Sequence, residues 1–251
     1  VFVAIDDIGT AKNNQKVLVK IISWHTKDRN PIGKVVDVLG EVGENNTEMH
    51  AILAEFGLPY RYPEEVEKAA NLISETIDSK EIAKRIDMRN VTTFTIDPRD
   101  AKDFDDALSI QKLSDNEFEV GVHIADVTHY VREGDIIDKE AERRATSVYL
   151  VDRTYPMLPE KLCNNLCSLR PNEDKLCFSA IFELDDNAKI YKQWIGRTII
   201  HSNHRFNYEE VQEIIETKQG KYSEEILILD SLAKALRAER FSHGSINFAS
   251  A

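Results

Sequence analysis

Five aspartates fall within ten consecutive residues, and only two basic residues among them offset the negative charge. The aspartates are Asp97, Asp100, Asp103, Asp105 and Asp106. The segments on either side, residues 92–96 and 107–113, have the apolar and β-branched character of strands. An acidic loop between two such strands is not an ordinary solvated run of charge. Any fold of this chain therefore has to accommodate several carboxylates close together.

Crowded carboxylates raise one another's pKa unless a cation joins them. A hard divalent ion with oxygen ligands satisfies such a group, and Mg²⁺ suits a site that also recruits substrate phosphates. Hydrolysis of a phosphodiester needs an activated water, a neutralised transition state and a stabilised leaving oxygen, which two ions roughly 4 Å apart can supply. The spacing by itself indicates a metal and leaves the reaction open.

Two other interpretations compete with a catalytic metal site. A solvated acidic turn is disfavoured by Phe104 and by the apolar strands on both sides. A calcium-binding EF-hand is disfavoured because its pattern of alternate acids, a glycine at the sixth position and a closing glutamate is not met. We expect Asp100 to cap the turn, a role that aspartate often takes.

The rest of the chain predicts an α+β fold built mainly on antiparallel sheet with flanking helices. Residues 1–58 are strand-rich, with strands over 17–22 and 33–40, which suits part of a small barrel. A helix is expected to begin at Pro63 and to reach Ile73. Further strands are expected over residues 92–96, 107–113, 117–127, 176–184 and 189–202, and further helices over 81–86, 136–144, 208–216 and 223–241.

Composition limits the class of protein. With 42% hydrophobic and 30% charged residues the chain is typical of globular proteins, and no apolar run approaches the roughly 20 residues of a membrane span. No signal peptide is visible. The three cysteines, Cys163, Cys167 and Cys177, suit a reducing cytoplasm and are expected as buried or half-buried thiols, since no second Cys/His pair has zinc-ligand spacing.

The formal net charge of −12 counts against nucleic-acid binding, because phosphate contacts need a basic surface, although a metal centre must itself be acidic. The sequence starts without methionine in what resembles the middle of a strand, and Ile246-Asn247-Phe248 resembles a further strand. We therefore expect a fragment of a longer protein.

The aspartate segment, Thr95-Ile96-Asp97-Pro98-Arg99-Asp100-Ala101-Lys102-Asp103-Phe104-Asp105-Asp106-Ala107, resembles the signature of the RNB catalytic domain. That domain defines the family of RNase II, RNase R and the exosome nucleases, and the sequence is most similar to the bacterial RNase R branch. Several later motifs agree in order and spacing: Gly121-Val122-His123-Ile124-Ala125-Asp126-Val127-Thr128-His129-Tyr130-Val131, Thr146-Ser147-Val148-Tyr149-Leu150, Pro156-Met157-Leu158-Pro159-Glu160, Asn165-Leu166-Cys167-Ser168-Leu169 and the stretch 202–208.

The resemblance covers roughly residues 64–251, while the preceding region resembles the end of the second cold-shock domain, which has an OB-type barrel. We therefore expect a partial cold-shock domain over residues 1–58 and the first part of an RNB domain over 59–251. The resemblance implies a hydrolytic, processive 3′-to-5′ exoribonuclease that takes single-stranded RNA at its 3′ end and releases nucleoside 5′-monophosphates.

By the same resemblance, Asp97, Asp103, Asp105 and Asp106 are the four catalytic aspartates and hold Mg²⁺, as two ions, with Mn²⁺ as an alternative. Asp105 matches the aspartate most closely tied to catalysis. The family's site also uses a glutamate and an arginine from later in the domain, which no position here matches. We therefore expect weak or no activity from this fragment alone, and RNA-degradation partners would bind through domains beyond it.

The resemblance also implies that Tyr149 stacks on the 3′-terminal nucleotide and limits how short the final product becomes, although on its own Val148-Tyr149-Leu150 suggests a core aromatic. Arg205 is a candidate for the RNA channel, with a surface charge as the alternative. His123, on an apolar strand, is expected to be a hydrogen-bonded structural residue, and Asp126 to orient neighbouring groups.

Two other functions remain open beside the exoribonuclease. One is a different metal-dependent phosphohydrolase acting on small phosphoesters, which the negative charge favours. The other is a non-catalytic RNA-binding module in which the acidic loop is purely structural.

Overall fold

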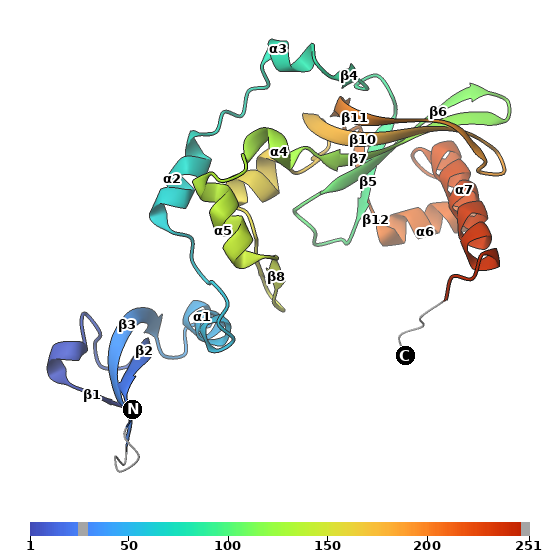
Figure 1. Ribbon diagram of the computed structural model, residues 1–251. Helices are drawn as coiled ribbons and strands as arrows, with labels where there is room; N and C mark the ends of the chain where they lie inside the picture. The colour runs from blue at the N-terminus through green and yellow to red at the C-terminus, as the bar shows by residue number, and fades with distance from the viewer. Residues whose placement is uncertain (25–29, 247–251) are drawn as a thin grey trace. The chain divides into compact units, whose positions relative to one another are not determined.

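The computed structural model describes residues 1–24 and 30–246, and the chain divides into two compact units (Figure 1). The small unit comprises Val1–Glu64 together with Glu142–Met157, and the large unit comprises Glu65–Ala141 and Leu158–Ala251. In the sequence, the segment Glu142–Met157 of the small unit therefore lies between the two stretches that form the large unit. Among the described residues, none of the helices combines the length and the apolar character needed to cross a membrane.

A three-stranded sheet forms the base of the small unit, in the order β1 (Phe2–Val3), β3 (Ile32–Glu41), β2 (Gln15–Ser23). A 3-10 turn, Ile5–Asp7, follows β1. β2 and β3 pair antiparallel and contain the predicted strands 17–22 and 33–40, whereas β1 pairs parallel with β3.

Helix α1 (Asn45–Glu55) lies in the region that the sequence predicted to be strand-rich, so that prediction missed a helix. Its apolar residues are spread around the helix and leave no single stripe by which to recognise it; only Thr47 and Leu53 are buried. The short strands β8 (Val148–Tyr149) and β9 (Thr154–Tyr155) pair beside it. Arg153 joins them to α1 through Asn46 and through Asn45 Oδ1 at 3.2 Å.

The large unit contains a seven-stranded sheet in the order β12 (His204–Asn207), β5 (Thr93–Asp97), β6 (Asp106–Ser114), β7 (Glu117–Ala125), β10 (Asp174–Asp185), β11 (Ile190–His201) and β4 (Ile86–Asp87). The pairs from β5 to β11 are antiparallel, and only the two outer pairs are parallel. The predicted antiparallel sheet is confirmed. The predicted strand 117–127 ends two residues earlier, at Ala125.

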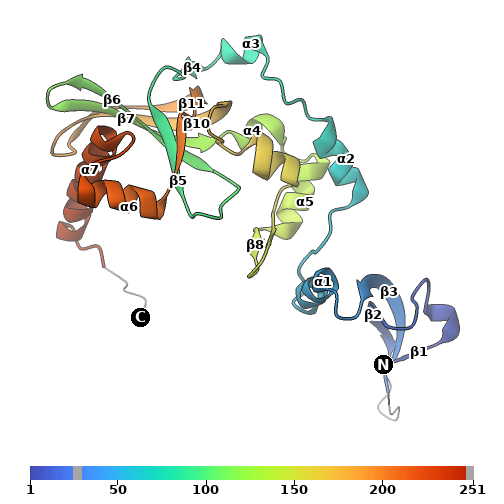
Figure 2. The ribbon, with the colours of Figure 1, turned by 180° about the vertical axis from the view of Figure 1, so that it is seen from behind.

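Helices α6 (Tyr208–Thr217) and α7 (Ser223–Ser242) cover one face of this sheet, as both views show (Figures 1 and 2). Asn207 and Glu210 form a reciprocal capping box that fixes where α6 begins. Apolar side chains between the sheet and these helices form two clusters. The clusters are Phe94, Phe206, Ile214 and Ile226, and Ile110, Phe118, Val120, Leu184, Ala188 and Leu232.

The remaining helices connect the strands. They are α2 (Glu64–Leu72), α3 (Ser79–Ile82), α4 (Val127–Tyr130), α5 (Ile136–Arg144) and a π-helix, Leu162–Leu166. The helix predicted over residues 81–86 is wrong in its bounds: Asp78 accepts a hydrogen bond from Lys80 N and caps a helix that ends at Ile82, after which β4 pairs with β11. The strand predicted at 246–248 lies largely outside the described residues.

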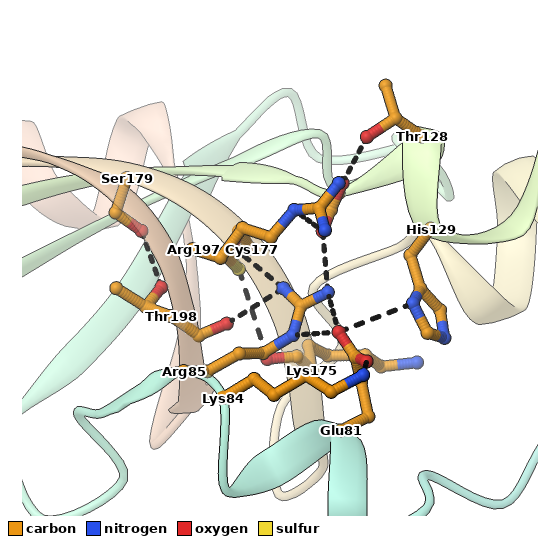
Figure 3. A network of polar contacts seen from close by, with 11 residues as sticks. Glu81, Lys84, Arg85, Thr128, His129, Lys175, Cys177, Ser179, Arg197 and Thr198 are labelled. Atoms are coloured by element: carbon orange, nitrogen blue, oxygen red, sulfur yellow. Dashed lines mark hydrogen bonds and ion pairs between the residues drawn. The ribbon is translucent and has the colours of Figure 1, made fainter.

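A buried ion network ties α3 to the sheet (Figure 3). The Arg85 side chain is fully buried and donates to Asp126 Oδ2 at 2.7 Å, to Glu81 Oε1 at 3.0 Å, and to the carbonyl oxygens of Cys177 and Thr198 at 3.2 and 3.3 Å. Burial by itself would raise the pKa of Asp126, but hydrogen bonds from Thr128 and Arg85 lower it overall. The predicted orienting role of Asp126 is confirmed.

The three cysteines are free thiols, two of them buried and Cys163 half-buried, as predicted. Burial raises the pKa of Cys163 and of Cys167 to about 12. These thiols therefore remain protonated and are poor nucleophiles at neutral pH.

Candidate metal centre

The four predicted catalytic aspartates lie where β5 and β6 separate. Asp97 is the last residue of β5, Asp106 is the first residue of β6, and the loop 98–105 joins them. The two strands pair only at Thr93 with Ser109 and Phe94 with Leu108, so their other ends diverge and leave room for the loop. Asp97 is buried, Asp103 is half-buried, and Asp105 and Asp106 reach the surface.

The four carboxylates are close enough to influence one another. The pKa of Asp105 is raised by loss of hydration and then by the charges of Asp103, Asp106 and Asp97, even though part of its side chain reaches solvent. Loss of hydration likewise raises the pKa of Asp97, with Asp106 and Asp103 adding to the effect and Arg205 opposing it. The fold thus gathers negative charge around Asp97 and Asp105, which Arg205 offsets in part.

The fit of a metal ion can be judged from two observations. Oδ2 of Asp97 is buried without a hydrogen-bond partner, and all four candidate ligands are hard carboxylate oxygens. A divalent cation would give the buried Asp97 oxygen a partner and would relieve the repulsion between the carboxylates, so these residues fit Mg²⁺. However, within residues 1–24 and 30–246 no group of three or more acidic, histidine or cysteine side chains is arranged around one point as a finished metal site.

One side of the acidic loop is anchored by the segment after the π-helix. The Phe104 amide donates to Ser168 Oγ at 3.1 Å, and that hydroxyl donates to the carbonyl oxygen of Lys102 at 3.2 Å. Leu169 N donates to the carbonyl oxygen of Phe104 at 2.8 Å. Ser168 and Leu169 are both fully buried. These bonds fix the backbone on both sides of Asp103.

The other side of the loop is anchored by Arg205 on β12. Its Nη2 donates to the carbonyl oxygens of Pro98 and, at 3.0 Å, of Arg99. The guanidinium carbon also lies 5.5 Å from the centre of the Phe104 ring. The backbone bond from Ala101 N to Pro98 O, at 3.0 Å, closes the turn around Asp100. The contacts of Arg205 are thus with the loop, and its predicted place in an RNA channel stays a prediction.

Tyr149 belongs to the small unit, where it is the second residue of β8 and pairs with Thr154. Its side chain is 67% exposed, so it is not a core aromatic. An exposed aromatic residue can stack on a base, and the predicted RNA contact remains a prediction.

His123 is a structural residue, as predicted. It is fully buried, with Nδ1 2.7 Å from Ser179 Oγ and Nε2 2.8 Å from Ser109 Oγ, and Ser179 Oγ lies 2.6 Å from Thr198 Oγ1. Burial lowers the pKa of His123 to about 4, so the ring is neutral at physiological pH. The four side chains form a polar row across β6, β7, β10 and β11.

Sequence reasoning did not assign a role to Ser168 or to Arg85. Ser168 lies in a motif that carries the family resemblance, and that was the only signal for it. Arg85 gave no signal, because a basic residue within the short helix predicted over residues 81–86 is usually solvated, and its burial depends on strands about 90 and 110 residues later in the chain.

Comparison with known proteins places this architecture in a family. A family model described as the RNB domain matches residues 85–251, and one described as the cold shock domain matches residues 1–63. Ribonuclease R of Thermotoga maritima is 38% identical over 252 residues, which cover 98% of this chain and 36% of that protein. The chain thus spans about a third of the length of this curated relative.

Two solved structures share the fold. Mycoplasma genitalium RNase R, in complex with ribose-methylated single-stranded RNA, has a TM-score of 0.87 at 29% identity over 99% of this chain and 40% of its own. Yeast Ssd1, described as a pseudonuclease, has a TM-score of 0.71 at 20% identity over 91% of this chain and 29% of its own, which shows the fold alone. Because the RNB-domain match extends over most of the chain and includes the acidic loop, the chain belongs to the RNB-domain family.

Proposed function

We propose that this chain carries the aspartate half of the active centre of a Mg²⁺-dependent exoribonuclease, which shortens single-stranded RNA from its 3′ end and releases nucleoside 5′-monophosphates. The observation that supports this most directly is the acidic loop itself. Four carboxylates of the family signature lie where β5 and β6 diverge, and there loss of hydration and the charges of the neighbouring aspartates raise the pKa of Asp97 and of Asp105.

Each aspartate has a role in this proposal. Asp97, Asp103, Asp105 and Asp106 would hold Mg²⁺, with Mn²⁺ as an alternative, and the bound ions supply an activated water and neutralise charge that develops on the phosphate. The strand ends fix Asp97 and Asp106, while the loop presents Asp103 and Asp105. Asp105 reaches solvent and can meet a substrate phosphate.

Tyr149 is proposed to stack on the terminal base of the RNA. Stacking on an aromatic ring contributes roughly 1–3 kcal/mol per base and accepts any base, which suits an enzyme that degrades RNA without regard to sequence. The 67% exposure of this ring is consistent with that role.

The location and partners follow from the same proposal. Three free thiols and no disulfide among the described residues are consistent with the cytoplasm. We propose that protein partners of RNA degradation bind outside this chain. We also propose, as the sequence predicts, that the partial cold-shock domain ends at residue 58 and that the RNB domain begins at residue 59.

Two alternatives remain. The net charge of −12 favours a phosphohydrolase that acts on small substrates, because RNA would be repelled. The other is a non-catalytic RNA-binding module in which the acidic loop is purely structural.

The test uses this chain in molar excess over a 5′-labelled single-stranded RNA, so that even slow cleavage is registered. In Mg²⁺ we expect removal of single nucleotides from the 3′ end, slow with this chain and faster with the full-length parent protein, and abolished by EDTA in both. Asp105→Asn should slow it by more than roughly 100-fold, since loss of a direct metal ligand should exceed the roughly 10–100-fold loss seen when a residue that supports a ligand is removed. Asp100→Asn, which alters the fifth aspartate of the loop, is the matched control and should retain the activity.

In the same assay Tyr149→Ala should give a longer final product at a largely unchanged cleavage rate. Tyr191→Ala, at an exposed tyrosine of the large unit, is the control and should leave the length of the final product unchanged. Turnover of a chromogenic phosphate ester without shortening of RNA would establish the phosphohydrolase instead. Retention of intact RNA with neither reaction, in the full-length parent protein as well as in this chain, would establish the binding module.

A further inference from the structure

Arg205 links two parts of the chain that are more than 100 residues apart in sequence. β12 pairs parallel with β5, and in this register Arg205 lies opposite Thr95, two residues before the metal-ligand candidate Asp97. From there its guanidinium reaches across the end of β5 to the carbonyl oxygens of Pro98 and Arg99, the first two residues of the acidic loop.

The guanidinium is held in place on more than one side. Nη2 donates to the two loop carbonyls, and the Phe104 ring lies 5.5 Å from the guanidinium carbon. Nε makes no hydrogen bond, but it is buried and therefore also points into the protein. An arginine reaching into an RNA channel would instead direct its donors toward solvent. The contacts therefore favour a role within the protein.

The loop has a second anchor at its other end. Ser168 Oγ bridges the amide of Phe104 and the carbonyl of Lys102, and Leu169 N donates to the carbonyl of Phe104. Asp97 and Asp106 are fixed by strand pairing. Asp103 lies between the two backbone groups that Ser168 holds, and Asp105 lies between this second anchor and β6, where its carbonyl oxygen accepts from Ala125 N at 3.0 Å. The course of the loop that leads to both residues depends on whether Arg205 and Ser168 hold the backbone.

We propose that Arg205 is a positioning residue of the metal centre, which holds residues 98–104 so that Asp103 and Asp105 meet Asp97 and Asp106, and that it does not grip RNA. This inference rests on the proposed function, because it assumes that the four aspartates bind a divalent ion. Ser168 acts from the opposite end of the loop in the same way.

Among the basic side chains, only arginine can make these contacts with the two loop carbonyls and the Phe104 ring at the same time. Its planar fork donates to two carbonyls at once and lies against an aromatic ring, whereas a lysine ammonium is a compact point charge on a flexible stem. Arg205→Lys therefore keeps the charge and loses the geometry, and Arg205→Met removes the donors but keeps an apolar stem. Arg240→Met, on the exposed end of α7, removes the same charge elsewhere and serves as the control.

The experiment measures binding without catalysis. Mn²⁺ bound to the intact chain is followed by the loss of the electron paramagnetic resonance signal of free Mn²⁺, and RNA affinity is followed by fluorescence anisotropy in EDTA. We expect Arg205→Met, Arg205→Lys and Ser168→Ala to weaken Mn²⁺ binding by roughly 10–100-fold, the range typical for residues that orient metal ligands. RNA affinity should stay within about twofold of that of Arg240→Met, since these side chains contact the protein. Circular dichroism of each variant is the control for correct folding.

The outcomes separate this inference from the proposed function. If the unmodified chain binds Mn²⁺ and Asp105→Asn abolishes it, but the Arg205 and Ser168 variants bind as before, the positioning role alone is refuted. Loss of RNA affinity with Mn²⁺ binding intact would make Arg205 an RNA contact. If the unmodified chain binds no Mn²⁺, the metal centre fails and the positioning role fails with it.

Discussion

The buried histidine of the large unit makes the stability of the fold depend on pH. The pKa of His123 is about 4 in the folded chain because of burial, compared with about 6.5 for an unperturbed histidine. Between these values the unfolded chain binds more protons, so the free energy of unfolding falls as the pH is lowered through this window. From pH 7.5 to pH 5 we expect a loss of about 2 kcal/mol from this residue.

Chemical denaturation of the chain and of His123→Asn at both pH values measures this contribution. The variant should be less stable at pH 7.5, because asparagine cannot bridge both Ser109 and Ser179, but it should lose about 2 kcal/mol less on acidification. His243→Asn, at the exposed end of α7, is the control and should behave like the unmodified chain. Parallel losses in the chain and in His123→Asn would contradict the assignment.

At the residue scale the sequence offered candidate metal ligands but not the residues that hold their loop in place. The spacing of Asp97, Asp103, Asp105 and Asp106 between two apolar segments is enough to indicate a metal. The contacts of Arg205 were not predictable, because they exist only once β12 pairs with β5, more than 100 residues away. The same holds for Ser168, whose hydroxyl reaches a loop 64 and 66 residues earlier.

At the scale of secondary-structure elements, the sequence predicted the strands and helices that have a clear apolar pattern. It missed the elements that form only through tertiary contacts. α5 was predicted at its observed bounds, and the long strands β7, β10 and β11 agree to within a few residues. In contrast, β12 has four residues and exists through its pairing with β5. Such short elements have no hydrophobic periodicity of their own from which they could be predicted.

Helix α3 is also held by tertiary contacts, since it has four residues and no buried residue of its own. Its attachment to the sheet passes through Arg85, three residues after its end, which bonds Glu81 of the helix (Figure 3). Arg85 also pairs with buried Asp126. Arg85→Met removes the shorter of the two ion pairs of Asp126 and leaves Arg197 Nε at 3.5 Å from Oδ2, and we expect a loss of roughly 3 kcal/mol in the free energy of unfolding, the lower end of the range for breaking a buried pair.

Denaturant titration of Arg85→Met, with Lys84→Met at the exposed neighbouring position as the control, tests this expectation. Adding Asp126→Asn to Arg85→Met should recover part of the loss, because the buried charge is then removed as well. A double variant no more stable than the single one would show that the loss comes from packing and not from the unpaired charge.

At the scale of the whole molecule, the two units differ in what holds them together. The large unit has apolar clusters beneath a seven-stranded sheet. In the small unit, Arg153, Tyr62 and Arg144 connect residues 142–157 to residues 45–62 through polar and cation–π contacts. A segment attached mainly by such contacts should open at a lower free energy than a sheet with a buried core.

Native-state hydrogen exchange of the whole chain tests this expectation. The Leu150 amide, which donates to the Arg153 carbonyl, should exchange with the same opening free energy as the amides of α1, below that of the amides in β7 and β10. Tyr62→Phe removes the hydroxyl that donates to the Pro156 carbonyl and should lower protection at Leu150 and in α1 by about 1 kcal/mol. Tyr191→Phe in the large unit should leave both unchanged. If Leu150 instead followed β10, residues 142–157 would fold with the sheet, and Tyr149 would be positioned by the large unit and not by α1.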